Sequence, residues 1–299
     1  MFENYIGQDH IKKILSGLIT YHKTAEEPLQ NMLITGNSGL GKTHLSNEIA
    51  KAMGTNFIAL LATTATQKDL VKAVCSLKDK DILFIDEIHA LDKKVVEMLF
   101  PIMAEGILYA EYQGTMQRFK VSKFTIIGAT DRPGLLNPAL LNRFQLSLNL
   151  KPYTINEFSQ LIRLHMKGFD VSDDMCIKIS ALCKDVPRIL INIVNSIKIY
   201  LKSIGKTKLE EQDLAMVREF LGVNELGLDT TDLIMLKYLF NNAFASLQTL
   251  ASVCGCLTTN IENLHEPYLI KLGFVTKDMR GRRLTQAGWD YVVAKGLNK

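Results

Sequence analysis

The fold of this chain is decided by the stretch Gly36-Asn37-Ser38-Gly39-Leu40-Gly41-Lys42-Thr43. It fills every fixed position of the G-x-x-x-x-G-K-S/T pattern, and it stands between the apolar run Met32–Ile34 and a segment with helical spacing, Lys42–Met53. Glycines let backbone N–H groups turn inward around a phosphate, and the positive end of the following helix favours the same charge. A plain glycine turn is the alternative, which the complete pattern in this context disfavours. We therefore predict a phosphate-binding loop.

Two side chains of this loop and two acids further along the chain form a recognisable pair of motifs. Lys42 can reach the β and γ oxygens of a nucleotide, and the Thr43 hydroxyl can hold Mg²⁺. The segment Asp81–Glu87 has the pattern of a buried strand and ends in two acids, Asp86 and Glu87. In a buried strand of this kind, the first acid would contact Mg²⁺ and the second would polarise the attacking water. A polar strand end is the alternative, but the two motifs in this order favour a nucleoside-triphosphatase.

Composition and cysteine usage narrow the class of protein. The chain has 299 residues, 47% of them hydrophobic, which predicts a folded protein of two or three domains. No basic segment followed by an apolar one opens the sequence, and no apolar run approaches the ~18 residues of a membrane helix. We therefore expect a cytoplasmic protein with no membrane partner. The five cysteines lack paired metal-ligand spacing, so we expect reduced thiols, and a metal site at Cys254, Cys256 and His265 is disfavoured.

Secondary-structure patterns divide the chain into three predicted domains. Strands alternate with helices over residues 1–151, which predicts an α/β fold with a parallel sheet covered on both faces. Residues 152–223 have only helical spacing and predict a small helical lid. Residues 224–299 predict three helices followed by two short strands around a basic turn, which is the pattern of a winged helix that binds duplex DNA. A helical protein-interaction domain with a solvated loop is the alternative for this last part.

Three short segments add candidate functional groups. Residues 107–121 predict a hairpin with its turn at Gln113-Gly114. Asp131 follows the apolar run Phe124–Ala129, so we expect it at the carboxyl end of the sheet, where ligands bind in such folds. Arg188 follows a proline at the start of a helix, where a cation can meet a phosphate. A solvated basic residue is the alternative for Arg188.

The basic charge of the chain is concentrated near its C-terminal end. The net charge of the whole chain is +4, and residues 271–283 alone carry a local charge of +4. The remaining residues therefore sum to zero. This placement favours DNA as the ligand of the predicted winged helix.

Several strings of the sequence resemble the RuvB family of AAA+ Holliday-junction branch-migration ATPases. In the first half of the chain they are Tyr5-Ile6-Gly7-Gln8, Gly39–Thr43, Leu83–His89 and Gly128–Leu136. In the C-terminal part they are Gly227-Leu228-Asp229, Thr249-Leu250-Ala251, Glu266–Ile270 and Arg280-Gly281-Arg282, which match the winged-helix domain of that family in order and spacing. The resemblance spans nearly the whole chain, and its C-terminal strings argue against other AAA+ proteins such as clamp-loader-like or helicase-loader ATPases.

The resemblance implies a homo-hexameric ring that uses ATP and Mg²⁺ to drive double-stranded or four-way-junction DNA in recombination and repair. By position, Glu87 would organise the attacking water, Asp131 would be sensor 1, Arg143 would be a finger that acts on a neighbouring subunit, and Arg188 would be sensor 2. The implied nucleotide contacts are Gly36, Gly39, Leu40, Gly41, Lys42, Thr43, His44 and Asp86, with Tyr5, Ile6 and Tyr153 around the adenine. Thr43 and Asp86 are also the implied metal ligands. The implied DNA contacts are the wing residues Arg280, Arg282 and Arg283.

The chain departs from the family pattern in three places. Asp131 stands where the family usually has threonine, and His44 stands where it has a second small hydroxyl residue. The hairpin 107–121 is shorter than the family hairpin that docks RuvA. A RuvA-like junction-binding partner follows from the resemblance, but the short hairpin argues against it. A carboxylate near the γ-phosphate should weaken nucleotide binding unless it is protonated, paired with Arg132 or turned away.

Two functions therefore stay open. The first is an ATP-driven motor for branch migration, which the intact Glu87 and Arg143 favour. The second is an ATP-switched DNA-binding ring or scaffold with little turnover, which Asp131 and the short hairpin favour.

Overall fold

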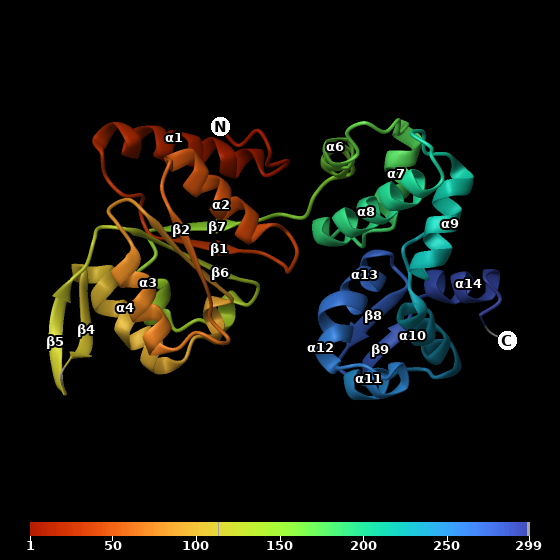
Figure 1. Ribbon diagram of the computed structural model, residues 1–299. Helices are drawn as coiled ribbons and strands as arrows, with labels where there is room; N and C mark the ends of the chain where they lie inside the picture. Colours follow the sequence, from red (N-terminus) through yellow and green to blue (C-terminus); the bar gives the residue numbers. More distant parts are fainter. Residues whose placement is uncertain (113, 298–299) are drawn as a thin grey trace. The chain divides into compact units, whose positions relative to one another are not determined.

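The computed structural model describes residues 1–112 and 114–297 (Figure 1). This part of the chain forms two compact units. The first unit comprises Met1–Glu157 together with Val186–Arg188, and the second comprises the other described residues. The short segment Val186–Arg188 thus belongs to the first unit, although the chain on either side of it belongs to the second. The finer division into three domains stays a prediction.

The first unit is built on a five-stranded sheet. All neighbouring strands run parallel, in the order β2-β3-β6-β1-β7. The strands are β1 (Met32–Thr35), β2 (Phe57–Leu61), β3 (Ile82–Asp86), β6 (Thr125–Thr130) and β7 (Leu146–Asn149). Every residue of β1 and β6 is buried, as strands covered on both faces require. The predicted parallel sheet is confirmed.

Helices cover both faces of this sheet. In Figure 1, α1 (Asp9–Ala25) and α2 (Lys42–Met53) lie over one face, and α3 (Gln67–Ser76) and α4 (Lys93–Glu105) lie over the other. Each helix buries an apolar stripe, and its fully buried members include Leu15, Ile19, Leu45, Ile49, Leu70 and Leu99. The turns that follow β3 and β6 are η1 (Ile88–Ala90), η2 (Pro133–Leu135) and α5 (Pro138–Leu141).

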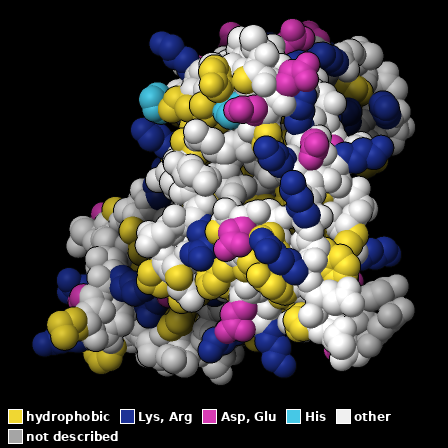
Figure 2. Space-filling view, turned by 90° about the vertical axis from the view of Figure 1, so that its left-hand side faces the viewer, with side chains coloured by type: hydrophobic (Ala, Val, Ile, Leu, Met, Phe, Trp, Pro, Cys, Tyr) yellow, Lys and Arg dark blue, Asp and Glu magenta, His cyan; other side chains and the backbone are white. Residues whose placement is uncertain are grey.

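A separate antiparallel hairpin projects from the first unit. It consists of β4 (Ile107–Tyr112) and β5 (Thr115–Lys120). The predicted hairpin is confirmed, although Gln113 of its predicted turn lies outside the described residues. Figure 2 shows the side of the molecule on which this hairpin lies, where hydrophobic side chains are exposed among basic and acidic ones. The exposed large apolar side chains of the hairpin are Tyr109, Met116 and Phe119.

Four helices follow the sheet along the chain. They are α6 (Ile155–His165), α7 (Asp173–Ala181), α8 (Pro187–Ser203) and α9 (Glu211–Leu221). Their ends have local causes: the Ser172 side chain accepts the Met175 N–H at the start of α7, and Gly222 ends α9 in the left-handed conformation. The helical structure predicted for this region is confirmed.

The C-terminal part of the second unit has the predicted winged-helix order. Its elements are α10 (Thr230–Asn241), α11 (Leu247–Cys254), α12 (Thr258–Asn260), a π-helical turn (Ile261–His265), α13 (Glu266–Lys271), β8 (Val275–Asp278), β9 (Gly281–Leu284) and α14 (Gln286–Ala294). Buried Leu236, Ile261, Leu269 and Val292 form the centre of its core. The sequence patterns did not predict α14. None of the described helices is long and apolar enough to cross a membrane.

Candidate active site

Three glycines give the phosphate loop its shape. Gly36, Gly39 and Gly41 have φ angles of 145°, 80° and 93°, a region that residues with side chains rarely adopt. A Cβ atom on Gly39 would also lie 2.5 Å from Cγ1 of Val186, so glycine is required there for space. Leu40 is buried and anchors the loop. Since α2 begins directly after Gly41, its free N–H groups open toward the loop.

Lys42 is held inside this loop. Lys42 is 6% exposed, and its Nζ donates to the carbonyl oxygens of Gly36 at 2.8 Å and Asn37 at 3.3 Å. Burial lowers the pKa of Lys42, and the carboxylates at the ends of β3 and β6 oppose that shift. The ammonium group therefore lies among backbone groups that a phosphate can replace as its partners.

Thr43 and Asp86 form the side of the site that suits a metal ion. Thr43 Oγ1 donates to Asp86 Oδ2 at 3.2 Å, and Asp86 Oδ1 accepts the backbone N–H of Glu87 at 3.1 Å. A hydroxyl and a carboxylate are hard oxygen ligands of the kind that Mg²⁺ prefers, usually together with water and phosphate oxygens. The two side chains thus fit the predicted metal site.

Glu87 lies in a strained backbone position directly after β3. Its φ angle is 51°, which is uncommon for a residue with a side chain and is often found at functional sites. Its Oε2 atom is buried, has no hydrogen-bond partner among the described residues, and lies 3.4 Å from Nδ1 of His89. Burial raises the pKa of Glu87, Asp131 adds to that shift, and Lys42 opposes it. This carboxylate is oriented and available to accept a hydrogen bond from water.

His89 links the ends of two strands, and the sequence patterns assigned it no role. Its Nδ1 lies 2.8 Å from Oγ1 of Thr130, the last residue of β6. Thr130 Oγ1 also accepts the backbone N–H of Arg132 at 2.9 Å. His89 therefore holds the turn after β3 against the turn after β6. Its position two residues after Glu87 was the only signal in the sequence.

Asp131, the predicted sensor, faces the same place. One ligand atom each of Glu87, His89 and Asp131 lie within 4.8 Å of one another. Asp131 Oδ1 is buried without a hydrogen-bond partner among the described residues, and Arg132 Nε lies 3.9 Å away from it. The Asp131 carboxylate thus lies beside Glu87 and forms a long ion pair with Arg132.

The two predicted catalytic arginines have different surroundings. A Cβ atom on Gly39 would lie 3.5 Å from Cβ of Arg188, which places Arg188 beside the phosphate loop. Arg143 follows α5 instead, where its Nη1 donates to the Ala139 carbonyl at 2.9 Å and its Cζ lies 4.2 Å from the centre of the Phe100 ring. Arg143 is thus held by α4 and α5.

Tyr5 closes the other side of the phosphate loop. It is 2% exposed, and a Cβ atom on Gly41 would lie 3.6 Å from its hydroxyl. Its ring stacks on His44, with ring centres 5.4 Å apart and planes inclined by 26°. Burial, and then the neighbouring Tyr153, raises the pKa of Tyr5. The structure therefore places Tyr5 next to Tyr153, both of them predicted adenine contacts, and next to His44 of the loop.

A pair of hydrogen bonds joins the N-terminal segment to the chain that follows β7. Gln8 Nε2 donates to the Lys151 carbonyl at 2.7 Å, and the Lys151 N–H donates to Gln8 Oε1 at 3.0 Å. Ile6, the remaining predicted adenine contact, is half-buried beside Gly7. A Cβ atom on Gly7 would lie 3.1 Å from the Tyr153 ring. The irregular N-terminal segment and the residues after β7 thus lie side by side.

Two family models match this chain. Residues 1–150 match the Holliday junction DNA helicase RuvB P-loop domain, and residues 225–293 match the RuvB C-terminal winged helix domain. This chain belongs to the RuvB family. Membership confirms the recognition made from the sequence strings and the fold of a P-loop AAA+ core with a winged helix.

Individual RuvB proteins are similar over nearly the whole length. The Holliday junction branch migration complex subunit RuvB of Trichormus variabilis is 33% identical over 97% of this chain and 82% of its own length. The corresponding subunit of Ehrlichia canis is 34% identical over 98% of this chain and 92% of its own. The solved structure of the Thermotoga maritima RuvB Holliday junction branch migration motor has a TM-score of 0.84 at 29% identity, covering 97% of this chain and 95% of that one.

The wing of this RuvB chain places its three arginines in different surroundings. Arg280 is exposed at the tip, and Arg283 is exposed with its Nε 3.6 Å from Asp278. Arg282 is only 7% exposed, and its Nε lies 2.5 Å from Oε2 of Glu266. Successive residues of a strand point to opposite faces, and residue 282 faces inward. The expectation that Arg282 contacts DNA does not fit this position, because its guanidinium is already used inside the winged helix.

Proposed function

We propose that this chain is an ATP-driven DNA motor that promotes branch migration of Holliday junctions. One observation carries the proposal: Lys42, the Thr43–Asp86 pair and Glu87 converge at the N-terminus of α2 in a chain that also carries a RuvB winged helix. A pure nucleotide switch needs the first three groups but has no need of an acid that activates water. Glu87 therefore favours turnover.

The residues of the site suit hydrolysis of Mg·ATP. The loop N–H groups and Lys42 would bind the phosphates, and Thr43 and Asp86 would hold Mg²⁺, which supplies charge neutralisation at the phosphate oxygens when bound. Glu87 would accept a hydrogen bond from the attacking water and align it with the γ-phosphate. Tyr5, Ile6 and Tyr153 would enclose the adenine. Phosphoryl transfer asks for this kind of positioning more than for covalent help.

A ring of subunits would complete the site. Arg143 is held by α4 and α5 of its own chain, so we assign it to the nucleotide of a neighbouring subunit in a homo-hexamer. A finger of this kind contributes roughly 10³–10⁵ in rate. Arg188 would instead act within its own subunit, because it lies beside the phosphate loop. Hydrolysis would then depend on assembly.

The wing would contact the DNA backbone through its exposed cations. Arg280 and Arg283 are the candidates, and neutralising phosphates without reading bases suits a motor that passes over any sequence. The short β4–β5 hairpin argues against a RuvA-like partner, whereas its exposed Tyr109, Met116 and Phe119 offer an apolar surface on which one would dock.

A second candidate function is an ATP-switched DNA-binding ring with little turnover. The specific observation in its favour is Asp131, whose carboxylate lies in the same cluster as Glu87. A second negative charge close to the γ-phosphate opposes ATP binding and alters the setting of the water-activating acid.

The test is steady-state ATP hydrolysis by the purified chain, alone, with linear duplex and with a four-way junction, using Lys42→Ala as the blank. The motor predicts turnover that DNA stimulates, followed by strand exchange in a branch-migration assay. Tight ATP binding with no turnover in any of these conditions would contradict the motor and favour the switch.

A further inference from the structure

A set of buried ion pairs runs through the second unit, outside the nucleotide site. Lys184 Nζ lies 2.7 Å from Asp229 Oδ2 and 2.5 Å from Asp232 Oδ2. The other carboxylate oxygen of Asp232 lies 2.8 Å from Nδ1 of His265. The Asp232 side chain has 0% exposure, and those of Lys184 and His265 have 8% and 11%. The Lys184 ammonium bridges the two carboxylates and compensates one of their two negative charges.

The residue after His265 continues the set into the wing. Glu266 is 4% exposed, and its two carboxylate oxygens contact Arg282 Nε at 2.5 Å and Lys277 Nζ at 3.0 Å. Both cations belong to the wing strands. His265 and Glu266 stand where the π-helical turn meets α13, next to Pro267, whose ring would clash with a carbonyl four residues earlier in a regular α-helix. The turn relieves that clash and lets adjacent side chains reach partners on different elements.

At the other end of this set of ion pairs, Lys184 is close in sequence to a segment of the nucleotide site. Lys184 comes two residues before Val186–Arg188, the segment of the first unit that places Arg188 beside the phosphate loop. Lys184 and Asp185 have φ angles of 49° and 60°, so the chain turns sharply here. Asp185 forms an ion pair with Lys271, the last residue of α13. This second ion pair also attaches the turn to the winged helix.

We propose that Asp232, His265 and Glu266 are positioning residues that tie the DNA-facing wing to the segment carrying Arg188, so that nucleotide binding and DNA binding are thermodynamically coupled. Buried ion pairs resist separation because each partner would be left as an uncompensated charge. The lid and the winged helix therefore move as one body when a nucleotide engages Arg188, and DNA on the wing biases the same movement. This inference rests on the proposed function, because it needs both ligands.

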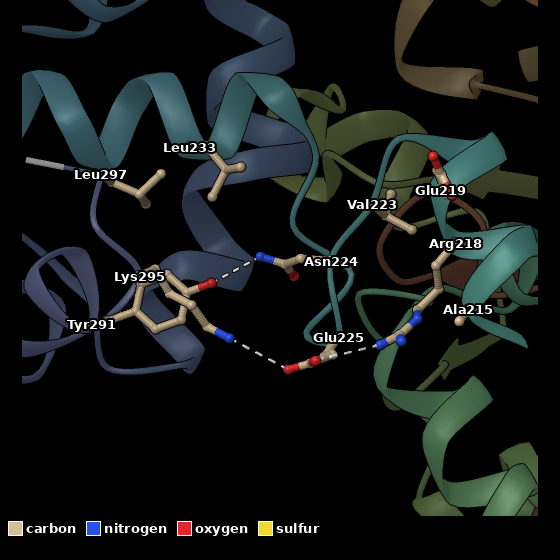
Figure 3. Close-up of a pocket in the computed structure, with 10 residues that line it drawn as sticks. All are labelled: Ala215, Arg218, Glu219, Val223, Asn224, Glu225, Leu233, Tyr291, Lys295 and Leu297. Atoms are coloured by element: carbon tan, nitrogen blue, oxygen red, sulfur yellow. Dashed lines mark hydrogen bonds and ion pairs between the residues drawn. The ribbon is translucent and has the colours of Figure 1, made fainter. Parts of the chain in front are cut away.

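A surface bridge in the same unit provides a matched control. Figure 3 shows it beside a hollow of about 420 Å³, where Glu225 lies 3.9 Å from Arg218 and 3.5 Å from Lys295. Asn224 donates to the Tyr291 hydroxyl at 2.8 Å in the same hollow. The Glu225 side chain is 68% exposed, so water replaces its partners at little cost.

The experiment measures coupling as a ratio of DNA affinities. A labelled linear duplex is titrated by fluorescence anisotropy against the full chain with Mg²⁺ and either ADP or a non-hydrolysable ATP analogue. The variants are His265→Leu, which removes the contact with Asp232, and His265→Asn, whose amide nitrogen can restore it. Glu225→Gln is the control. Sedimentation of each variant records the oligomeric state, because assembly alone also changes affinity.

In the wild type, we expect the DNA affinities measured with the ATP analogue and with ADP to differ by at least about 5-fold. The ratio of these affinities should fall to about 1 in His265→Leu and return in His265→Asn, with Glu225→Gln like the wild type and all variants assembling alike. An unchanged ratio in His265→Leu, or a loss explained by altered assembly, overturns the inference. A wild-type ratio of about 1 also overturns it but leaves the proposed function standing, whereas absence of DNA or nucleotide binding in the wild type removes the proposed function itself.

A second variant covers the case in which His265→Leu does not fold by circular dichroism. Glu266→Gln keeps the contact between Asp232 and His265 and weakens only the contacts to Arg282 and Lys277. The ratio should again fall toward 1 without loss of nucleotide affinity measured with a fluorescent nucleotide. A wild-type ratio in folded Glu266→Gln overturns the inference.

Discussion

Arg280 and Arg282 lie two residues apart in the wing, but the structure predicts opposite effects of removing them. Arg282→Ala leaves Glu266 buried with only Lys277 as a partner. Breaking a buried ion pair from one side costs about 3–5 kcal/mol, and the remaining lysine at 3.0 Å offsets part of that loss. We therefore expect the winged helix to lose about 2–3 kcal/mol of unfolding free energy.

The chain offers a built-in probe for this measurement. It contains one tryptophan, Trp289 of α14, whose ring packs on Phe240 with centres 4.0 Å apart. Tryptophan fluorescence during urea unfolding therefore reports on the winged helix. With an m-value of about 2 kcal/mol/M, Arg282→Ala should lower the urea midpoint by about 1–1.5 M.

Arg280→Ala is the matched variant, because its side chain is exposed at the wing tip. We expect its free energy of unfolding to stay within about 0.5 kcal/mol of the wild type. Its DNA affinity should fall about equally for all sequences, and its salt slope should drop by about one. If Arg282→Ala kept wild-type stability and lost one unit of salt slope, Arg282 would be a phosphate contact and its structural role in the winged helix would be contradicted.

Three further predictions concern the nucleotide site, assembly and pH. Glu87→Gln should retain ATP binding in a fluorescent-nucleotide titration while phosphate release falls by about 10²-fold or more; unchanged turnover would exclude the water-activating role. Arg143→Ala mixed with Lys42→Ala should hydrolyse more ATP than either variant alone, and no gain at any mixing ratio would argue against a trans finger. Burial raises the pKa of Asp229, but Lys184, the backbone N–H of Asp232 and His265 together lower it more and hold that pKa below its usual 3.8. The contribution of the ionised Asp229 to folding stability is therefore present above pH 3.8, and it is lost as the pH falls through the lower pKa that Asp229 has in the folded protein. In urea unfolding across that range, Asp229→Asn should show a smaller loss than the wild type, and an equal loss would contradict the assignment.

The sequence predicts the parts of this molecule that local patterns determine. The phosphate loop needs Gly36, Gly39 and Gly41 because their φ angles are positive, and that need is visible as a motif. The strands β1 and β6 appear as uninterrupted apolar runs because both of their faces are buried. The wing is likewise visible in the sequence as two short strands around a basic turn, because neighbouring residues form it.

The parts that the sequence did not predict depend on contacts between distant residues. His89 gains its role from Thr130, which lies 41 residues away. Arg282 was predicted to bind DNA because its charge adjoins other charges, but its burial is set by the inward face of β9 and by Glu266 on another element. α14 has an N-cap at Thr285 that the patterns passed over, because the helix is short and follows the wing directly.

The buried pairing of Lys184 with Asp232 also bears on how this chain can be recombined with its relatives. A chimera joined at residue 225, where the match to the winged-helix model begins, would inherit Asp232 and His265 but take residue 184 from the other parent. If that parent lacks a cation there, a fully buried carboxylate loses its main partner, at a cost of about 3–5 kcal/mol. The segment that can be exchanged as a functional module therefore starts before Lys184. Over evolutionary time, these positions should have been inherited and replaced together.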